Sequence, residues 1–150
     1  MKIFLVSIRR DGLRGDLEEQ QMLKMSEFFQ QQNLASPEIK ILAPDKVGLF
    51  GGLISHLQKS LAGSEYIPTP WVVSVRDHLV FDRLELFCKE HSECKTIIIV
   101  SYISDVKILV YKWNMKYRKA FRQTCFGSDG VREGSVHLVD TTTRTVKRLY

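Results

Sequence analysis

The feature that most constrains the fold is an apolar run, TIIIV, at residues 96–100. A strand with one face in solvent alternates apolar and polar side chains, and this run shows no such alternation. The run therefore predicts a central strand that is covered on both faces, with helices forming the two covers.

Four more strands and four helices are predicted around this run. Apolar, partly β-branched stretches indicate strands at residues 3–6, 38–42, 135–139 and 145–149. Apolar residues at three- and four-residue spacing indicate helices at residues 16–32, 49–61, 76–91 and 105–123, the last capped by Ser104. Gly63, Pro68 and Pro70 indicate a loop, and residues 71–75 could add a short extended piece.

The order of these elements specifies the fold class. Strands that alternate with helices indicate a largely parallel sheet with helices on both faces, and the closing hairpin adds antiparallel pairing. We expect an α/β fold, a three-layer α/β/α sandwich with a mostly parallel sheet and an antiparallel C-terminal strand. The length of 150 residues and the hydrophobic content of 44% fit a single domain at residues 1–150.

Composition narrows the classes of function. No stretch approaches the roughly 20 apolar residues that span a bilayer, so we expect a soluble, cytoplasmic protein with no membrane partner. Cys88, Cys94 and Cys125 are odd in number and lack C-x-x-C spacing, so we expect reduced thiols, no metal site and no cofactor. The formal charge of +5 favours anionic partners, and the sequence does not specify the oligomeric state.

A site is expected at one edge of the predicted sheet. In parallel sheets, ligands bind beyond the carboxyl ends of the strands, which singles out the loops at residues 7–10, 43–46 and 101–104. Arg9, Arg10 and Lys46 would then lie near the amino end of the helix that begins at Asp105, an arrangement that suits a phosphate or carboxylate. The alternative is that these cations are solvated loop ends.

The sequence also resembles a known family in the order of its elements. The segments MKIFLV, ILAP, TIIIVSYISDV and GSVHLVD look like the histidine phosphatase superfamily, which is phosphoglycerate mutase-like, and above all like its small phosphohistidine phosphatases. The resemblance covers nearly the whole chain, and it implies the same three-layer fold and a phosphate site at the carboxyl edge of the sheet.

The same resemblance implies that the catalytic residues are replaced. The family's Arg-His-Gly, which carries the nucleophilic histidine, falls on Ser7, Ile8 and Arg9; its second phosphate-binding arginine falls on Val47 and its second histidine on Tyr102. Isoleucine has no lone pair for attack on phosphorus, and valine cannot clamp a phosphate oxygen. Tyr102 could still donate one hydrogen bond.

These departures favour a catalytically degenerate protein that serves as a noncatalytic anion-binding or protein-interaction module. The candidate anion ligands are Ser7, Arg9, Arg10, Lys46, Tyr102 and Ser104.

The first alternative is a phosphoester hydrolase with an altered site that uses Ser7, Tyr102 or His78. Ser7 would be exposed enough to act as a nucleophile, although no base is visibly paired with it, and His78 lies early enough in its helix to reach the cleft. The remaining histidines fit structural places. His56 lies about 13 Å along its helix from Val47, the position of the replaced arginine. His91 lies at a helix end and His137 on a strand face.

The second alternative is nucleic-acid binding through the basic helix at residues 105–123. This helix has no acidic residue after its start, and Tyr111 lies among its cations, as on surfaces that bind nucleic acids. A solvated helix face is the simpler interpretation, because Lys and Arg are also common on exposed helix surfaces. The cations that would contact phosphates are Lys112, Lys116, Lys119 and Arg122.

The GLFGG segment at residues 48–52 lacks the spacing of a phosphate-binding loop. Its three glycines predict a helix that starts late or frays.

Overall fold

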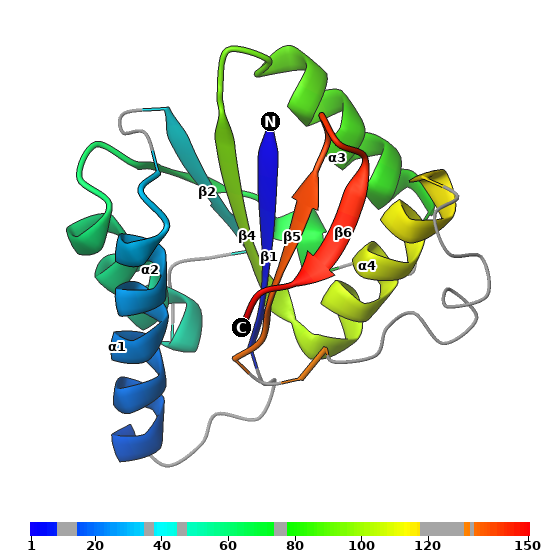
Figure 1. Cartoon of the computed structure of the whole chain (residues 1–150). Coiled ribbons are helices and arrows are strands. Elements are labelled where there is room, and N and C mark those ends of the chain that lie inside the picture. Colours follow the sequence, from blue (N-terminus) through cyan, green and yellow to red (C-terminus); the bar gives the residue numbers. More distant parts are fainter. Residues whose placement is uncertain (9–14, 35–37, 45–47, 74–77, 118–130, 133) are drawn as a thin grey trace.

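A computed structural model describes the chain except residues 9–14, 35–37, 45–47, 74–77, 118–130 and 133 (Figure 1). Its centre is a six-stranded sheet in the order β3-β2-β4-β1-β5-β6. The strands are β1 (Lys2–Ile8), β2 (Ile39–Ala43), β3 (Glu65–Pro68), β4 (Thr96–Tyr102), β5 (Val136–Asp140) and β6 (Thr145–Arg148). The helices are α1 (Gly15–Gln31), α2 (Gly48–Ser60), the short 3-10 helix η1 (Pro70–Val73), α3 (His78–Glu90) and α4 (Ile103–Tyr117).

The predicted central strand is confirmed. β4 lies between β1 and β2 and is parallel to both, and every residue from Thr96 to Ser101 is buried. Its alternate side chains enter two different cores. Ile97 and Ile99 pack with α3 and α4, whereas Ile98 and Val100 pack with α1 and α2.

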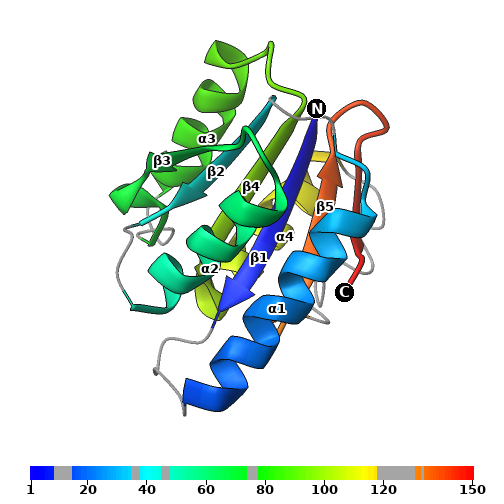
Figure 2. The same cartoon turned by 90° about the vertical axis from the view of Figure 1, so that its left-hand side faces the viewer.

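The helices form two layers, one on each face of the sheet. α1 and α2 cover one face and α3 and α4 the other (Figures 1 and 2). The α1/α2 core contains Phe4 and Phe29, whose rings meet edge to face at 5.3 Å, and the α3/α4 core contains the fully buried Trp113. The expected three-layer α/β/α architecture is therefore present.

Antiparallel pairing occurs around β5, the first strand of the closing hairpin. β5 runs antiparallel to β1, and β6 pairs antiparallel with β5. The strand that opposes the parallel ones is therefore β5, with β6 returning beside it at the sheet edge. Among the described residues, no helix is long and apolar enough to cross a bilayer.

Two local predictions are wrong near the other edge of the sheet. Residues 65–68, expected in a loop, form the edge strand β3, which pairs in parallel with β2. Lys40 and Glu65 are register partners and form an ion pair at 2.7 Å between Nζ and Oε2. The possible extended piece after Pro70 is the 3-10 helix η1 instead.

The glycine-rich segment also differs from its prediction, because α2 begins at Gly48 and runs through Gly52. A Cβ atom at Gly52 would lie 2.8 Å from Sδ and 2.9 Å from Cε of Met22 in α1. The missing side chain thus allows the two helices to approach closely. Similarly, α4 begins at Ile103, so Ser104 lies in its first turn and does not precede it as a cap.

Candidate functional site

The carboxyl ends of β2, β4 and β1 meet at one edge of the sheet, as the site prediction required. The three strands are parallel neighbours, and Ser7 pairs in register with Ser101 and Ile8 with Tyr102. The chain leaves β1 for α1 on one face of the sheet and leaves β4 for α4 on the opposite face. Such a change of face is the switch point at which ligands bind in open α/β sheets.

Ile8 and Tyr102 lie side by side at this switch point. They are register partners, and both are partly buried against the α1/α2 core. The Tyr102 ring lies 5.2 Å from the Phe50 ring of α2, at an interplanar angle of 59°. The two positions to which the family resemblance assigns histidines are thus adjacent here, and they carry an alkyl and a phenol side chain.

Ser7 is buried, and the expectation that it is exposed is wrong. Its exposed fraction is 0%, and its hydroxyl donates a hydrogen bond to the Arg132 carbonyl. Its Oγ also lies 2.8 Å from Oγ of Ser135, which accepts the Arg132 N–H at 3.1 Å. A serine has one hydroxyl proton, so the proton of Ser7 points at a carbonyl and not at a general base.

Asp105 is a buried carboxylate that is not among the site residues predicted from the sequence. It lies in the first turn of α4 and is 5% exposed, and its Oδ2 accepts a hydrogen bond from the Ser101 hydroxyl at 3.4 Å. A carboxylate in this position interacts favourably with the helix dipole. The sequence feature that could have identified this carboxylate is an acidic residue three positions after the end of β4. An acidic side chain therefore lies at the start of α4, beside the carboxyl edge of the sheet.

The other predicted anion ligands divide into two groups. Tyr102 and the exposed Ser104 lie at the carboxyl edge. Arg9, Arg10, Lys46 and the replaced position Val47 lie outside the described residues, so their gathering stays a prediction.

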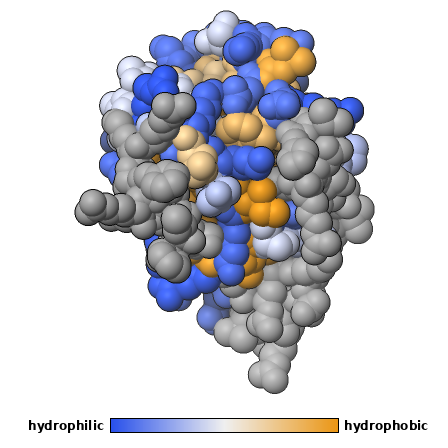
Figure 3. All heavy atoms as spheres, turned by 90° about the vertical axis from the view of Figure 1, so that its right-hand side faces the viewer, coloured by the Kyte–Doolittle hydropathy of each residue, from blue (hydrophilic) through white to orange (hydrophobic). Residues whose placement is uncertain are grey.

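The basic face of α4 is described in part. Lys112 and Lys116 lie in α4, whereas Lys119 and Arg122 lie outside the described residues. Lys116 forms an ion pair with Glu85 of α3 at 2.9 Å, so one cation of this basic face already has an anionic partner. The side of the molecule that carries α3 and α4 mixes hydrophilic and hydrophobic residues (Figure 3). Nucleic-acid binding stays a prediction, with the Lys116 pair weighing against it.

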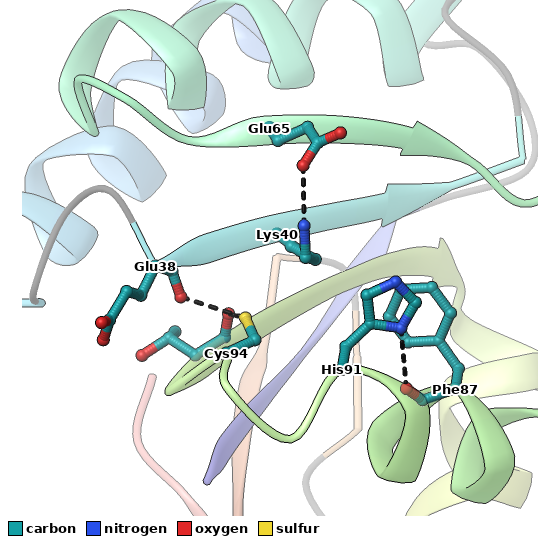
Figure 4. Close-up of polar contacts among 7 residues, drawn as sticks. Glu38, Lys40, Glu65, Phe87, His91 and Cys94 are labelled. Atoms are coloured by element: carbon teal, nitrogen blue, oxygen red, sulfur yellow. Dashed lines mark hydrogen bonds and ion pairs between the residues drawn. The ribbon is translucent and has the colours of Figure 1, made fainter.

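Two of the described histidines, His137 and His91, lie away from Ile8. His137 is 2% exposed and pairs in register with Leu5, so it lies on the α3/α4 face, opposite the face of Ile8. His91 follows α3, and its Nδ1 lies 2.9 Å from the Phe87 carbonyl while its ring stacks on the Phe87 ring (Figure 4). His78 opens α3, and its side chain lies outside what the structure describes.

Comparison with known proteins gives the fold. No protein-family model and no curated protein matches the sequence. Among solved structures, the chain is similar to one named for the phosphohistidine phosphatase SixA of Agrobacterium tumefaciens, with a TM-score of 0.66 and 7% identity over 99% of this chain and 95% of that chain. It is also similar to phosphoglycerate mutase of Plasmodium falciparum, with a TM-score of 0.60 and 8% identity over 100% of this chain and 90% of that chain. The fold is therefore phosphoglycerate mutase-like, as expected, and identities this low establish the fold alone.

Proposed function

We propose that this chain is a catalytically degenerate protein of the histidine phosphatase fold, which binds a phosphate-like anion at the carboxyl edge of the sheet without hydrolysing it. The observation that carries the proposal is the pairing of Ile8 with Tyr102 at the switch point. The resemblance to the histidine phosphatases assigns the nucleophilic histidine to the position of Ile8 and the second phosphate-contacting histidine to that of Tyr102. Here neither position offers an imidazole.

Two features of the site support the loss of covalent catalysis. Ile8 has no lone pair, so no phosphoenzyme can form through it. Ser7, the neighbouring hydroxyl, is buried and donates a hydrogen bond to the Arg132 carbonyl. A nucleophile would need both exposure and a base in hydrogen-bonding reach.

Retained anion binding is supported by the placement of the strands. β1 and β2 end at the same edge of the sheet, and the cations Arg9, Arg10 and Lys46 follow within three residues of those ends. α4 starts directly after β4, so its N–H groups point toward the same edge. The Asp105 carboxylate opposes an anion there, so we expect the affinity to be modest.

The catalytic part is tested with the full chain on a phosphohistidine peptide and on p-nitrophenyl phosphate. We expect no turnover above the background of a mock purification. Turnover that survives repurification and disappears in Ser7→Ala, His78→Ala or Tyr102→Phe would instead establish the altered phosphoester hydrolase.

The binding part is tested by titrating inorganic phosphate into ¹⁵N-labelled protein. We expect saturable shifts at Tyr102 and Ser104, with a Kd raised about tenfold by Arg9→Gln combined with Arg10→Gln. Asp105→Asn should lower the Kd several-fold, and a Lys24→Gln/Lys147→Gln control should leave it unchanged. If phosphate produces no shift at this edge, the anion-binding role is wrong and a protein-interaction module remains.

A further inference from the structure

A second concave site lies at the opposite end of the sheet. A cavity of about 370 Å³ opens beside the amino end of β1, between the last turns of α3 and α4 and the turn that joins β5 to β6. Its lining includes Met1 and Ile3 from the start of the chain and Thr141 from that turn. Ile8 is at the other end of β1, so this cavity is separate from the switch point.

The floor of the cavity is apolar and aromatic. Ile3, Trp113 and Tyr117 line it and are 1%, 2% and 8% exposed. The Cys88 thiol also lines it, and burial is the main cause that raises the pKa of this thiol to about 11. The sulfur is therefore uncharged at neutral pH, and the floor suits a flat hydrophobic group.

The rim of the cavity is cationic. Lys89, Lys116 and Arg144 line it together with one carboxylate, Glu85, which leaves a formal excess of two positive charges. Lys116 pairs with Glu85 at 2.9 Å, so the excess rests mainly on Lys89 and Arg144.

Arg144 is held in place over the aromatic floor. Its guanidinium lies 5.2 Å from the centre of the Tyr117 ring. The turn that carries it is tied by Asp140, whose Oδ1 accepts N–H groups from Thr142 at 2.9 Å and Thr143 at 3.2 Å. A guanidinium that already stacks on a ring can contact an anion at its edge.

We propose that this cavity binds a small organic anion with a flat apolar body, such as an aromatic carboxylate or sulfonate. The ring would lie along the apolar floor that Ile3, Cys88 and Trp113 line, and the acidic group would reach Lys89 and Arg144, which covers the Tyr117 ring. The volume of about 370 Å³ lies within the range of small-molecule pockets, and it suits one or two fused rings. The proposal is independent of the anion at the carboxyl edge, because the two sites share no residue.

The test uses the full chain with naphthalene-2-sulfonate as the anionic probe and 2-naphthalenemethanol as its uncharged match. Binding is followed by isothermal titration calorimetry and by ¹⁵N NMR. We expect saturable binding of the sulfonate, with shifts at the Trp113 indole N–H and at the Ser92 and Thr141 amides, and binding of the alcohol at least tenfold weaker.

The matched variants separate this site from general charge effects. Lys89→Gln combined with Arg144→Gln should raise the Kd of the sulfonate at least tenfold. Lys24→Gln combined with Lys147→Gln removes the same charge from exposed positions outside the cavity and should leave the Kd within twofold. Ser92→Trp, at an exposed position of the rim, should also block binding, and the amide spectrum of each variant verifies that it is folded.

Four results would each overturn the proposal. The first is the absence of saturable shifts up to about 10 mM probe, a Kd too weak for a built site. The second is equal affinity for the sulfonate and the alcohol. The third is a Kd that the Lys89/Arg144 change leaves untouched. The fourth is a set of shifts that cluster at Tyr102 instead of Trp113.

Discussion

At the carboxyl end of β1, the Ser7 hydroxyl connects the first strand to the segment that precedes β5. It donates to the Arg132 carbonyl and lies 2.8 Å from Oγ of Ser135, while the Gly134 N–H donates to the Ser7 carbonyl at 2.9 Å. All of these partners lie more than 120 residues away in the sequence. Their contribution is therefore to tertiary structure.

Replacing Ser7 with alanine tests this role. We expect Ser7→Ala to lower the free energy of unfolding by about 1–3 kcal/mol, because it leaves buried polar partners unsatisfied. Urea denaturation measures the loss. Ser104→Ala, at an exposed position of the same edge, should change stability by less than about 0.5 kcal/mol. Equal effects at the two positions would contradict the buried network.

At the scale of elements, the long segments were predictable and the short or closely packed ones were not. The apolar run of β4 and the periodic helices follow from composition and spacing alone. β3 has four residues, ends in a proline and lies at a sheet edge, so no local signal separates it from a loop. The packing of α2 depends on α1, because Gly52, which would weaken an isolated helix, is what allows Met22 to approach.

The α1/α2 contact leads to a prediction about coupled residues. Gly52→Ala gains helix propensity of about 1 kcal/mol but pushes its Cβ into the Met22 side chain. We expect Gly52→Ala to stabilise the Met22→Ala variant by about 1 kcal/mol more than it stabilises the native chain. A double-mutant cycle in urea gives this difference, and independent effects would contradict the close packing.

The edge strand β3 leads to a prediction about pH. The hydrogen bond and charge of Lys40 hold the pKa of Glu65 below its ordinary value (Figure 4). A carboxylate whose pKa is lowered by folding stabilises the fold above its unfolded pKa, and this contribution disappears as the pH falls through the folded value. Lys40→Gln should therefore move the Glu65 midpoint upward in a ¹³C NMR titration. A midpoint that does not move would contradict the ion pair at this edge.

At the scale of the whole molecule, one strand stabilises two cores. Ile98 and Ile99 are neighbours in β4, both are 0% exposed, and they enter the α1/α2 and α3/α4 cores respectively. The three-layer fold was predictable because such a strand requires cover on both faces. The burial of Ser7 was not, because its partners arrive from a distant segment of the chain. The pairing of Asp105 with Ser101 had a local signal, the acidic first turn of α4.

Truncating these two isoleucines tests the layered architecture. We expect Ile98→Ala and Ile99→Ala each to lower the free energy of unfolding by about 2–5 kcal/mol, because each leaves a cavity in a different core. Lys107→Ala, exposed on α4, is the control and should cost less than about 0.5 kcal/mol. A large loss at only one isoleucine would mean that one face of the sheet lacks its helical cover.

The length of β1 determines how far apart the two proposed binding sites lie. Seven residues at the usual strand rise separate its ends by about 20 Å. Two small ligands, one bound at each end, would not touch. An inhibitor bound at one end would leave access to the other end open. Any influence of one ligand on the other would have to pass through the protein, along β1 or along α4, which starts at one site and lines the other.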